Sequence, residues 1–332
     1  MIRNAHYLDE SKREAWTRYL LGEIREKRLV SLYVEPASAC NLACRFCDFH
    51  FRAHEVGFAK RKRLMSMSMF ENVVQQVREL PFRFSSIHFY LHGEPLLHPR
   101  LAEMISMARR LNLADFYKIL TNGTLLDPSR FVLLVESGAT SITVSLDTMD
   151  GERYSKFKGK DLLPLVMQNI AYAIHATKNH KDFELIIKCT RSHDIYGLQQ
   201  DEVEEIVSYF SDAAAESSNI HVEIRDEFSW AGSDRQDVAP RTRPCELPFY
   251  QLVISCEGVV SACCNDINYG LEIGRLSPGG DTLNSIAHGE RLQRLRRLVL
   301  ARDFDSLAIC KYCSFTGISD LFDHTCEIAD LI

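Results

Sequence analysis

Three closely spaced cysteines are the residues of this 332-residue chain whose types and spacing most clearly predict chemistry. Cys40, Cys44 and Cys47 follow a short apolar run that predicts a strand. Thiolates are ligands for soft metals, so three that converge can bind one iron–sulfur centre. Three ligands leave one iron of a four-iron cluster open, which suits catalysis. The alternative is a structural zinc site, with Asp48 or His50 as the fourth ligand.

A second group of four cysteines lies in the last quarter of the chain, at Cys245, Cys263, Cys310 and Cys313. Four thiolates are enough to ligate a four-iron cluster completely. The Cys-x2-Cys pair also suits a small structural zinc ribbon, which is the alternative. A free cysteine most often packs as a small apolar side chain, and this is the simplest expectation for the others. They are Cys189, Cys256, Cys264 and Cys326.

The elements that must position the first group alternate between strands and helices. Between the predicted strands lie segments of helical period, the first of which opens with a capping-box pattern at Ser68 and Glu71. This alternation predicts a parallel sheet, which the pattern alone leaves as an open barrel or a doubly wound sheet. The apolar runs that predict its six strands are residues 30–35, 86–91, 116–120, 141–146, 183–189 and 220–224.

The pattern changes near residue 230, where the polar, proline-containing segment 231–244 predicts a boundary. Residues 9–28 predict a charged amphipathic helix ahead of the first strand. We therefore expect an N-terminal helix over 1–29, a barrel domain over 30–230 and a small third domain over 231–332. In the third domain the sequence predicts strands at 251–254 and 259–261 and a basic helix at 290–301.

Four motifs in the barrel region resemble those of the radical S-adenosylmethionine (SAM) superfamily. The cysteines fit its CxxxCx(aromatic)C signature, with Phe46 in the aromatic position. Residues 92–95 (HGEP) resemble its GGEP motif, residues 121–124 its TNGT motif, and Ser145 the serine that ends the fourth strand. These motifs follow successive predicted strands, at the ends where a barrel places its active site. The resemblance implies an α/β fold with a partial (β/α)6 TIM barrel.

The second cysteine group resembles the auxiliary-cluster domain called SPASM, or its shortened twitch form. This resemblance implies a small C-terminal α+β domain with an auxiliary [4Fe–4S] cluster on Cys245, Cys263, Cys310 and Cys313. The spacing from Gly258 favours Cys263 over the adjacent Cys264 as ligand. A full SPASM domain has further cysteines where this chain has Ser319 and Asp323. We therefore expect one auxiliary cluster here, with every iron ligated.

The resemblance also implies a SAM-binding [4Fe–4S] cluster on the first three cysteines and names residues that contact SAM. Glu94 is expected to bind the SAM amino group, since a carboxylate and an ammonium form a charge-assisted hydrogen bond. Lys158 occupies the place of an arginine that meets the SAM carboxylate in many relatives; the alternative is a solvated surface lysine. Gly93 and Pro95 would shape the turn, and Asn122 and Ser145 are candidates for the ribose or carboxylate.

Radical SAM enzymes cleave SAM reductively to a 5′-deoxyadenosyl radical, which takes hydrogen from an inert C–H bond. The resemblance to twitch-type relatives favours a hydroxylated small molecule as substrate: an aminocyclitol, a sugar or a nucleoside. A closed auxiliary cluster suits electron transfer, so we expect a two-electron oxidation in natural-product biosynthesis. The alternatives on a similar substrate are a dehydratase, or an epimerase in which Cys326 or Cys256 is the catalytic thiol.

Two other function classes are weighed against a small-molecule enzyme. The first is a peptide or protein maturase that acts on ribosomal peptides or sulfatases. Peptide modifiers often carry a leader-binding domain, and the roughly 30 residues that precede the first predicted strand are too few for it. A non-enzymatic iron–sulfur protein is the other, and it would leave the HGEP and TNGT segments without a purpose.

Composition limits the partners of the chain. A formal net charge of −6 argues against nucleic-acid binding by bulk electrostatics. No apolar run reaches the roughly 20 residues that span a bilayer, and the polar N-terminus has no signal-peptide core. We therefore expect a cytoplasmic enzyme with a small-molecule substrate and a reductant of the flavodoxin or ferredoxin type, without membrane or nucleic-acid partners.

Overall fold

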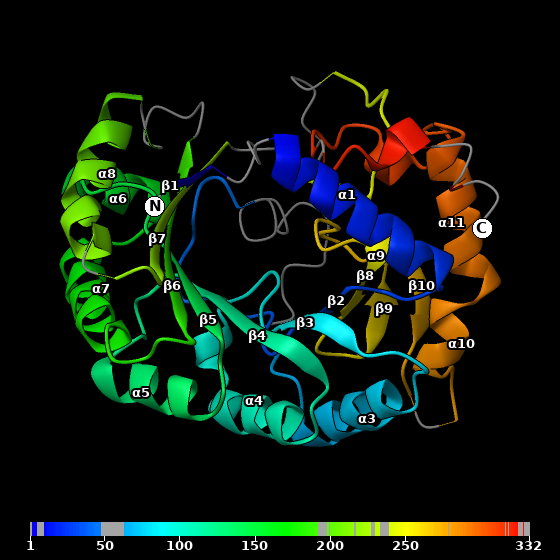
Figure 1. The fold of residues 1–332 in the computed structure, drawn as a ribbon, viewed down its shortest axis with the longest axis horizontal. Coiled ribbons are helices and arrows are strands. Elements are labelled where there is room, and N and C mark those ends of the chain that lie inside the picture. The colour runs from blue at the N-terminus through cyan, green and yellow to red at the C-terminus, as the bar shows by residue number, and fades with distance from the viewer. Residues whose placement is uncertain are drawn as a thin grey trace.

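A single curved sheet forms the core of the protein (Figure 1). Within the residues that the structure describes, the sheet has ten strands in the order β1-β7-β6-β5-β4-β3-β2-β8-β9-β10. This structure is a computed structural model. It describes residues 2–4, 10–47, 63–191, 198, 200–215, 217–226, 230–232, 239–277, 279–315, 317, 319–324 and 328.

Six parallel strands make up the central part of the sheet, in chain order from β2 to β7. Each overlaps one of the six apolar runs in the sequence, and together they form the partial barrel that was expected rather than a doubly wound sheet. Their bounds are β2 Ser31–Val34, β3 Phe84–His88, β4 Ala114–Thr121, β5 Ser141–Ser145, β6 Glu184–Arg191 and β7 Ile220–Asp226.

The two faces of these strands differ in burial. Alternate residues of a strand point to opposite faces, and those that face the helices are fully buried, as at Leu32, Ile119 and Ile187. Of the residues that point inward, Tyr33 and Lys188 are partly buried, whereas their register partners His88 and Glu223 are buried. A closed barrel fills its interior with packed side chains. The partly exposed inner face indicates that the interior of this barrel is open to solvent and to ligands.

Helices cover the outer side of the curved sheet (Figure 1). The first after β2 is α3, Met67–Arg78, and its N-cap is Ser66, whose Oγ accepts a hydrogen bond from the Met69 amide at 3.1 Å. The capping box predicted at Ser68 and Glu71 was therefore wrong, because the extended backbone that a cap requires occurs two residues earlier. The other barrel helices are α4 Leu101–Arg110, α5 Pro128–Glu136, α6 Gly151–Lys158, α7 Leu163–Thr177 and α8 Gln200–Ala215, with the 3₁₀ turn η1 Pro95–Leu97.

The N-terminal segment contributes a strand as well as the predicted helix. Helix α1, Glu10–Arg25, agrees with the amphipathic pattern of residues 9–28 and packs against α9 and η3. Strand β1, Ile2–Asn4, was not predicted and pairs in parallel with β7. Three residues are too short a run for hydrophobic periodicity to reveal.

The C-terminal part continues the barrel sheet instead of forming a separate one. Strand β8, Gln251–Ile254, pairs in parallel with β2, and the hairpin partner β9, Val259–Ser261, leads outward to β10, Glu272–Arg275. The division at residues 230 and 231 stays a prediction, since strands on both sides of it share one sheet. The remaining elements are α9 Leu247–Tyr250, α10 Leu283–Ala287, α11 Glu290–Leu300, η2 Ala308–Cys310 and η3 Leu321–His324.

Candidate functional site

The cysteine loop, residues 36–47, follows β2 and is held on one side by the turn at residues 92–95. The Glu94 amide donates to the Ala39 carbonyl at 2.8 Å. A Cβ atom on Gly93 would overlap the Ala37 carbonyl oxygen and lie 2.5 Å from that of Ala39. Glycine is therefore required where this turn packs against the loop, which gives a physical reason for the second glycine of the motif.

The end of α6 holds the other side of the cysteine loop. The Ala43 and Arg45 amides donate to the carbonyls of Lys158 and Phe157, at 3.3 and 2.9 Å. The rings of Phe46 and Phe157 stack with centroids 4.6 Å apart. The aromatic residue of the signature thus anchors the loop to α6, an element that the sequence did not predict.

Glu94 joins two strand ends. Its carboxylate is 2% exposed and accepts hydrogen bonds from the Leu96 amide, the Thr121 hydroxyl and the Asn122 amide, at 3.0, 2.7 and 2.8 Å. Burial raises the pKa of this carboxyl group. The described contacts of Glu94 are therefore structural, and its expected contact with the SAM amino group stays a prediction.

Asn122 lies directly beside the first cysteine group. Its side-chain nitrogen donates to the Asn41 oxygen at 2.9 Å and lies 3.9 Å from the Cys40 sulfur. Its side-chain oxygen accepts from the amide and the hydroxyl of Thr124. The TNGT segment is thereby brought against the cysteine loop, as the order of the motifs predicted.

Lys158 is 1% exposed, so the alternative of a solvated surface lysine is wrong. Its ammonium pairs with the buried Asp147 carboxylate and donates to the Ser145 hydroxyl at 3.3 Å. Burial alone would lower the pKa of Lys158, but the Asp147 and Cys44 side chains outweigh burial and raise it. Lys158 therefore stays charged. Together with Ser145, it lies close to the cysteine loop.

The thiols of the cysteine loop suit metal ligation. Burial raises the pKa of Cys44 to about 11, with Lys158 opposing this and Cys40 adding to it. The Cys47 amide donates to the Cys44 carbonyl at 3.1 Å, so the loop turns back on itself between these two residues. A bound metal displaces the proton of a thiol, which removes the penalty that burial places on ionisation. The loop therefore fits a three-thiolate [4Fe–4S] site.

The structure gathers the four predicted auxiliary cysteines into one region, in which Cys263 and Cys313 are buried and Cys245 and Cys310 are partly buried. Burial raises the pKa of Cys245 and of Cys310 to about 12, and the Cys313 thiol contributes to both shifts. Burial likewise raises the pKa of Cys263 well above its usual value, with Cys245 and Cys313 among its neighbours. The Asn265 amide donates to the Cys263 sulfur at 3.3 Å. This four-thiol set fits a fully ligated cluster.

Arg241 contacts the segments that carry two of the auxiliary cysteines, a role that sequence reasoning missed. Its guanidinium lies 3.8 Å from the Cys313 sulfur and donates to the carbonyls of Cys313 and Pro244, each at 3.2 Å. It also donates to the carbonyls of Arg243 and Phe315. One cation therefore fastens the segments that carry Cys245 and Cys313 and places its charge beside the sulfurs.

The Cys264 thiol has neighbours in the barrel sheet as well as in the auxiliary set, where it interacts with Cys313. The same thiol hydrogen-bonds with Tyr33 and Gln251, whose side chains lie on β2 and β8, and burial raises its pKa to about 11. The Cys263 thiol interacts with Cys264, Cys245 and Cys313. Cys263 as the ligand, which the spacing from Gly258 favours, therefore stays a prediction, and Cys264 is the residue that connects this region with Tyr33 on the barrel strand β2.

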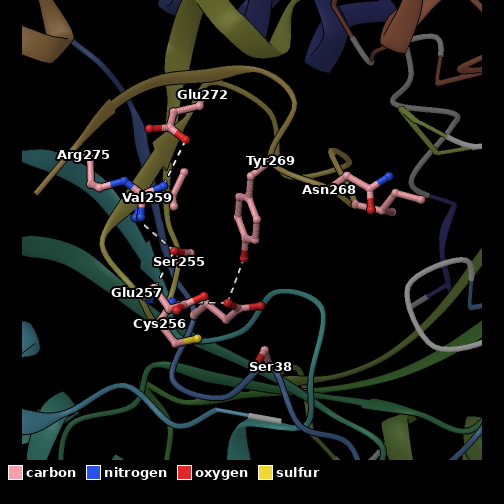
Figure 2. Close-up of a pocket in the computed structure, with 11 residues that line it drawn as sticks. Ser38, Ser255, Cys256, Glu257, Val259, Asn268, Tyr269, Glu272 and Arg275 are labelled. Carbon is pink, nitrogen blue, oxygen red and sulfur yellow. Dashed lines mark hydrogen bonds and ion pairs between the residues drawn. The ribbon is translucent and has the colours of Figure 1, made fainter. Parts of the chain in front are cut away.

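Cys256 lies in a pocket of about 300 Å³ at the junction of β2 and the C-terminal part (Figure 2). Its thiol is 9% exposed, and burial followed by the Glu35 carboxylate raises its pKa to about 12. Glu35 itself accepts from the Tyr269 hydroxyl at 2.7 Å and lies 3.3 Å from His92. Cys326, the other proposed catalytic thiol, lies outside the described residues, as do Asp48 and His50.

The zinc alternatives gain no support from the part of the chain that is described. There, no group of three or more His, Cys, Asp or Glu side chains is arranged to hold one metal ion. Zinc requires its sulfur ligands about 2.3 Å from a single ion. A four-iron cluster distributes its thiolates over separate irons and so allows them to lie farther apart.

The sequence pattern of the radical SAM superfamily matches residues 34–210, and that of an iron–sulfur cluster-binding domain, SPASM, matches residues 245–314. The first match covers more than half of the chain, and the chain belongs to the radical SAM superfamily. A SAM-binding [4Fe–4S] cluster, an auxiliary iron–sulfur centre and SAM are the cofactors of this pair of domains. Among the described residues, no helix is long and apolar enough to cross a membrane.

Curated relatives align with only part of this chain. The GTP 3′,8-cyclase of Chlorobaculum tepidum is 26% identical over 178 residues, which are 49% of this chain and 50% of that protein. The PqqA peptide cyclase of Gluconobacter oxydans is 29% identical over 133 residues, 39% of this chain and 34% of that protein. The chain spans about half the length, or less, of these two relatives.

Solved structures share the fold over nearly the whole chain. BtrN in complex with AdoMet and 2-DOIA has a TM-score of 0.56 and 17% identity, and covers 88% of this chain and 96% of its own. Native anSMEcpe with bound AdoMet has a TM-score of 0.59 and 15% identity, with coverages of 91% and 96%. At such identities the likeness shows the fold alone, and it agrees with the predicted partial barrel.

Proposed function

We propose that this enzyme oxidises a hydroxylated small molecule, of aminocyclitol, sugar or nucleoside type, by two electrons. The observation that carries the proposal is the position of Cys263 and Cys264. Cys263 belongs to the auxiliary set, whereas the next residue contacts Tyr33 on the inner face of the barrel. An electron acceptor at the auxiliary site would therefore lie close to a substrate inside the barrel. The small-molecule and AdoMet ligands named for BtrN are consistent with this reading.

The SAM-binding cluster and SAM together supply the 5′-deoxyadenosyl radical that removes a hydrogen atom from the substrate. The cysteine loop, fixed by the 92–95 turn and by α6, holds Cys40, Cys44 and Cys47 for that cluster. Asn122, Ser145 and Lys158 present polar groups beside it for SAM. Loss of the hydrogen atom, one further electron and the hydroxyl proton would convert a carbinol into a ketone, and a cluster held by Cys245, Cys263, Cys310 and Cys313 would be the acceptor of that electron. A flavodoxin or ferredoxin supplies the first electron.

Epimerisation is the second candidate, and a specific observation favours it. Cys264 is a described thiol directed toward the barrel interior, so it is better placed to return a hydrogen atom than Cys256, which lines the pocket beside Glu35. Cyclisation and peptide modification are further candidate reactions, because relatives of this chain are named as GTP 3′,8-cyclases and as a PqqA peptide cyclase. No feature of the described site favours them over oxidation.

The cluster assignment is tested by exchanging all three loop cysteines for alanine. Anaerobic reconstitution of the unmodified protein should give about eight irons per chain, four for each cubane. The C40A/C44A/C47A variant should retain about four irons and form no 5′-deoxyadenosine with dithionite and SAM. Continued SAM cleavage by this variant would disprove the assignment.

The reaction type is tested by product mass with a substrate deuterated at the reactive carbon. Oxidation predicts a product two hydrogens lighter, with one deuterium recovered in 5′-deoxyadenosine. An unchanged mass apart from a solvent hydrogen at that carbon would establish epimerisation, and loss of water would establish dehydration. Cys264→Ser separates the first two outcomes further, because oxidation should survive this change whereas a thiol-dependent epimerisation should stop.

A further inference from the structure

The inner wall of the barrel carries an aromatic shelf, formed by Tyr33, His88 and Tyr90. The rings of Tyr33 and His88 stack with centroids 4.2 Å apart, and Tyr90 meets Tyr33 edge-on at 5.7 Å. The His88 ring nitrogens lie 2.9 Å from the Ser86 and Tyr90 hydroxyls. Burial, followed by Lys118 and Arg225, lowers the pKa of His88 well below its usual value, so this shelf is uncharged at neutral pH.

Basic side chains line the same wall. Lys118 on β4 is the register partner of His88, and Lys188 on β6 is the register partner of Glu223 on β7. Arg225 follows two residues after Glu223 on the same face and forms an ion pair with it. Its guanidinium also interacts electrostatically with the hydroxyls of Tyr33 and Tyr90, so it reaches across the interior toward the shelf.

Arg225 is accessible although it stands on this inner face. Its side chain is 45% exposed, whereas that of Glu223 is 10% exposed. Because Arg225 lies near strands on the far side of the sheet, its exposed surface opens into the barrel interior. The guanidinium is therefore presented to whatever molecule enters the barrel.

The charges on this wall do not balance. Two cations, Lys188 and Arg225, share one carboxylate on this wall, Glu223. Of the nearby carboxylates, Asp147 also attracts Lys188 but is paired with Lys158, and Asp226 is paired with Arg191. Among the described residues no side chain accepts a hydrogen bond from the Lys188 ammonium. Burial and then the proximity of Arg225 lower its pKa. Positive charge gathered in a partly buried wall is unfavourable unless an anion joins it.

We propose that Lys188 and Arg225 bind an oxyanion group, carboxylate or phosphate, of the substrate inside the barrel. This inference rests on the proposed function and adds a charged substituent to the expected hydroxylated substrate. An oxyanion accepts paired hydrogen bonds from a guanidinium, with the lysine as a second charge. The aromatic shelf opposite supplies a flat surface for the rest of the molecule.

Matched pairs of neutral and anionic compounds test the proposal in the reconstituted holoenzyme. The probes are glucose with glucose 6-phosphate, galactose with galacturonate, and guanosine with guanosine 5′-monophosphate. For each compound, the concentration that half-maximally shifts the thermal midpoint is measured with SAM present, together with the rate of 5′-deoxyadenosine formation. We expect the anionic member of at least one pair to act at a concentration at least tenfold lower than its neutral partner.

Variants then assign the anion preference to residues. Arg225→Gln and Lys188→Met should each remove most of the tenfold preference, whereas Arg191→Gln, a control on the other face of β6, should keep it. Preference retained in the first two variants, or no preference in any pair, would overturn the proposal.

SAM is the other molecule in the site with an anionic group, so its affinity is measured separately. The proposal expects Arg225→Gln and Lys188→Met to change SAM affinity less than threefold. A tenfold loss would assign the cations to the SAM carboxylate and overturn it. Failure of the proposed oxidation has a different signature, because the product of an accepted compound would then not be two hydrogens lighter, whether or not the anionic compound is preferred.

Discussion

The Arg241 side chain both holds segments of the chain together and places a positive charge beside the auxiliary cysteines. Every nitrogen of its guanidinium donates to the segments that surround the auxiliary cysteines. Hydrogen bonds and positive charge at cluster sulfurs favour the reduced, more negative state and so raise the reduction potential. Sequence patterns could not reveal this residue, since an arginine in a polar segment has no periodic or motif signal.

Arg241→Gln should make the reduction potential of the auxiliary cluster more negative. The C40A/C44A/C47A background isolates that cluster, and an EPR-monitored redox titration measures its potential. Arg241→Lys keeps the charge but loses the planar fork, so its potential should lie between the other two. A potential unchanged in Arg241→Gln at full iron content would contradict this role.

Lys158→Met should destabilise the fold by about 3–5 kcal/mol, because it leaves the Asp147 carboxylate buried without its partner. Denaturant unfolding of the apo protein measures the loss. The D147N/K158M double variant is the control and should recover part of it. Equal stability of K158M and the unmodified protein would show that the pair contributes nothing.

The same pair predicts a pH dependence. In the unmodified protein, burial acts to raise the pKa of Asp147. The charge of Lys158 outweighs burial, so the pKa of Asp147 is lowered. The stability this provides is present above the ordinary aspartate pKa and is lost as pH falls through the lowered value. In K158M, burial is opposed only by Lys188 and the Ser145 hydrogen bond, so the pKa of Asp147 should lie above its value in the unmodified protein and the folded state should bind the proton more tightly. The K158M deficit should therefore be smaller at pH 5 than at pH 8.

At the scale of elements, Gly93→Ala tests how the 92–95 turn holds the cysteine loop. The added methyl group would collide with the Ala37 and Ala39 carbonyls, which are backbone and cannot rotate away. The variant should lose the SAM-binding cluster and keep the auxiliary one, reducing iron from about eight to about four per chain. Gly22→Ala, in the open surface of α1, is the matched control and should keep all of its iron. Full iron content in Gly93→Ala would contradict the docking argument.

Elements with strong periodicity were predictable from the sequence, whereas those defined by contacts were not. Apolar runs such as 183–189 found the strands because parallel strands are buried on the helix side. Helix α6, Gly151–Lys158, escaped notice because its sequence is largely polar and charged, and its end is fixed by contact with the cysteine loop. The burial of Lys158 depends on its contacts with Asp147 and Ser145, so spacing alone could not decide between a contact with SAM and a surface residue. The two sets of cysteines were predictable because residue type and spacing alone indicate which side chains can ligate a metal cluster.

At the scale of the whole molecule, the shared sheet predicts cooperative unfolding. Strand β8 pairs with β2 along four residues, so the C-terminal part and the barrel should melt together. Far-UV circular dichroism and tryptophan fluorescence should give coincident urea transitions for the apo protein. Leu252→Ala, at a fully buried position of β8, should shift both transitions equally, with a loss of about 2–5 kcal/mol. Two separate transitions would contradict a single unit.

Two long-range strand pairings also limit when the sheet can be completed during synthesis. Strand β1 pairs with β7 through Ile2 and Val222, and β2 pairs with β8 through Ser31 and Gln251, so both pairings join residues 220 positions apart. A ribosome adding about 5–20 residues per second needs roughly 10–40 s to cover that distance. During this interval the early strands wait with unpaired edges, which are sites for aggregation. Assembly of the iron sites against β2 therefore belongs after translation of β8, when the strand that leads to the cysteine loop first acquires both neighbours.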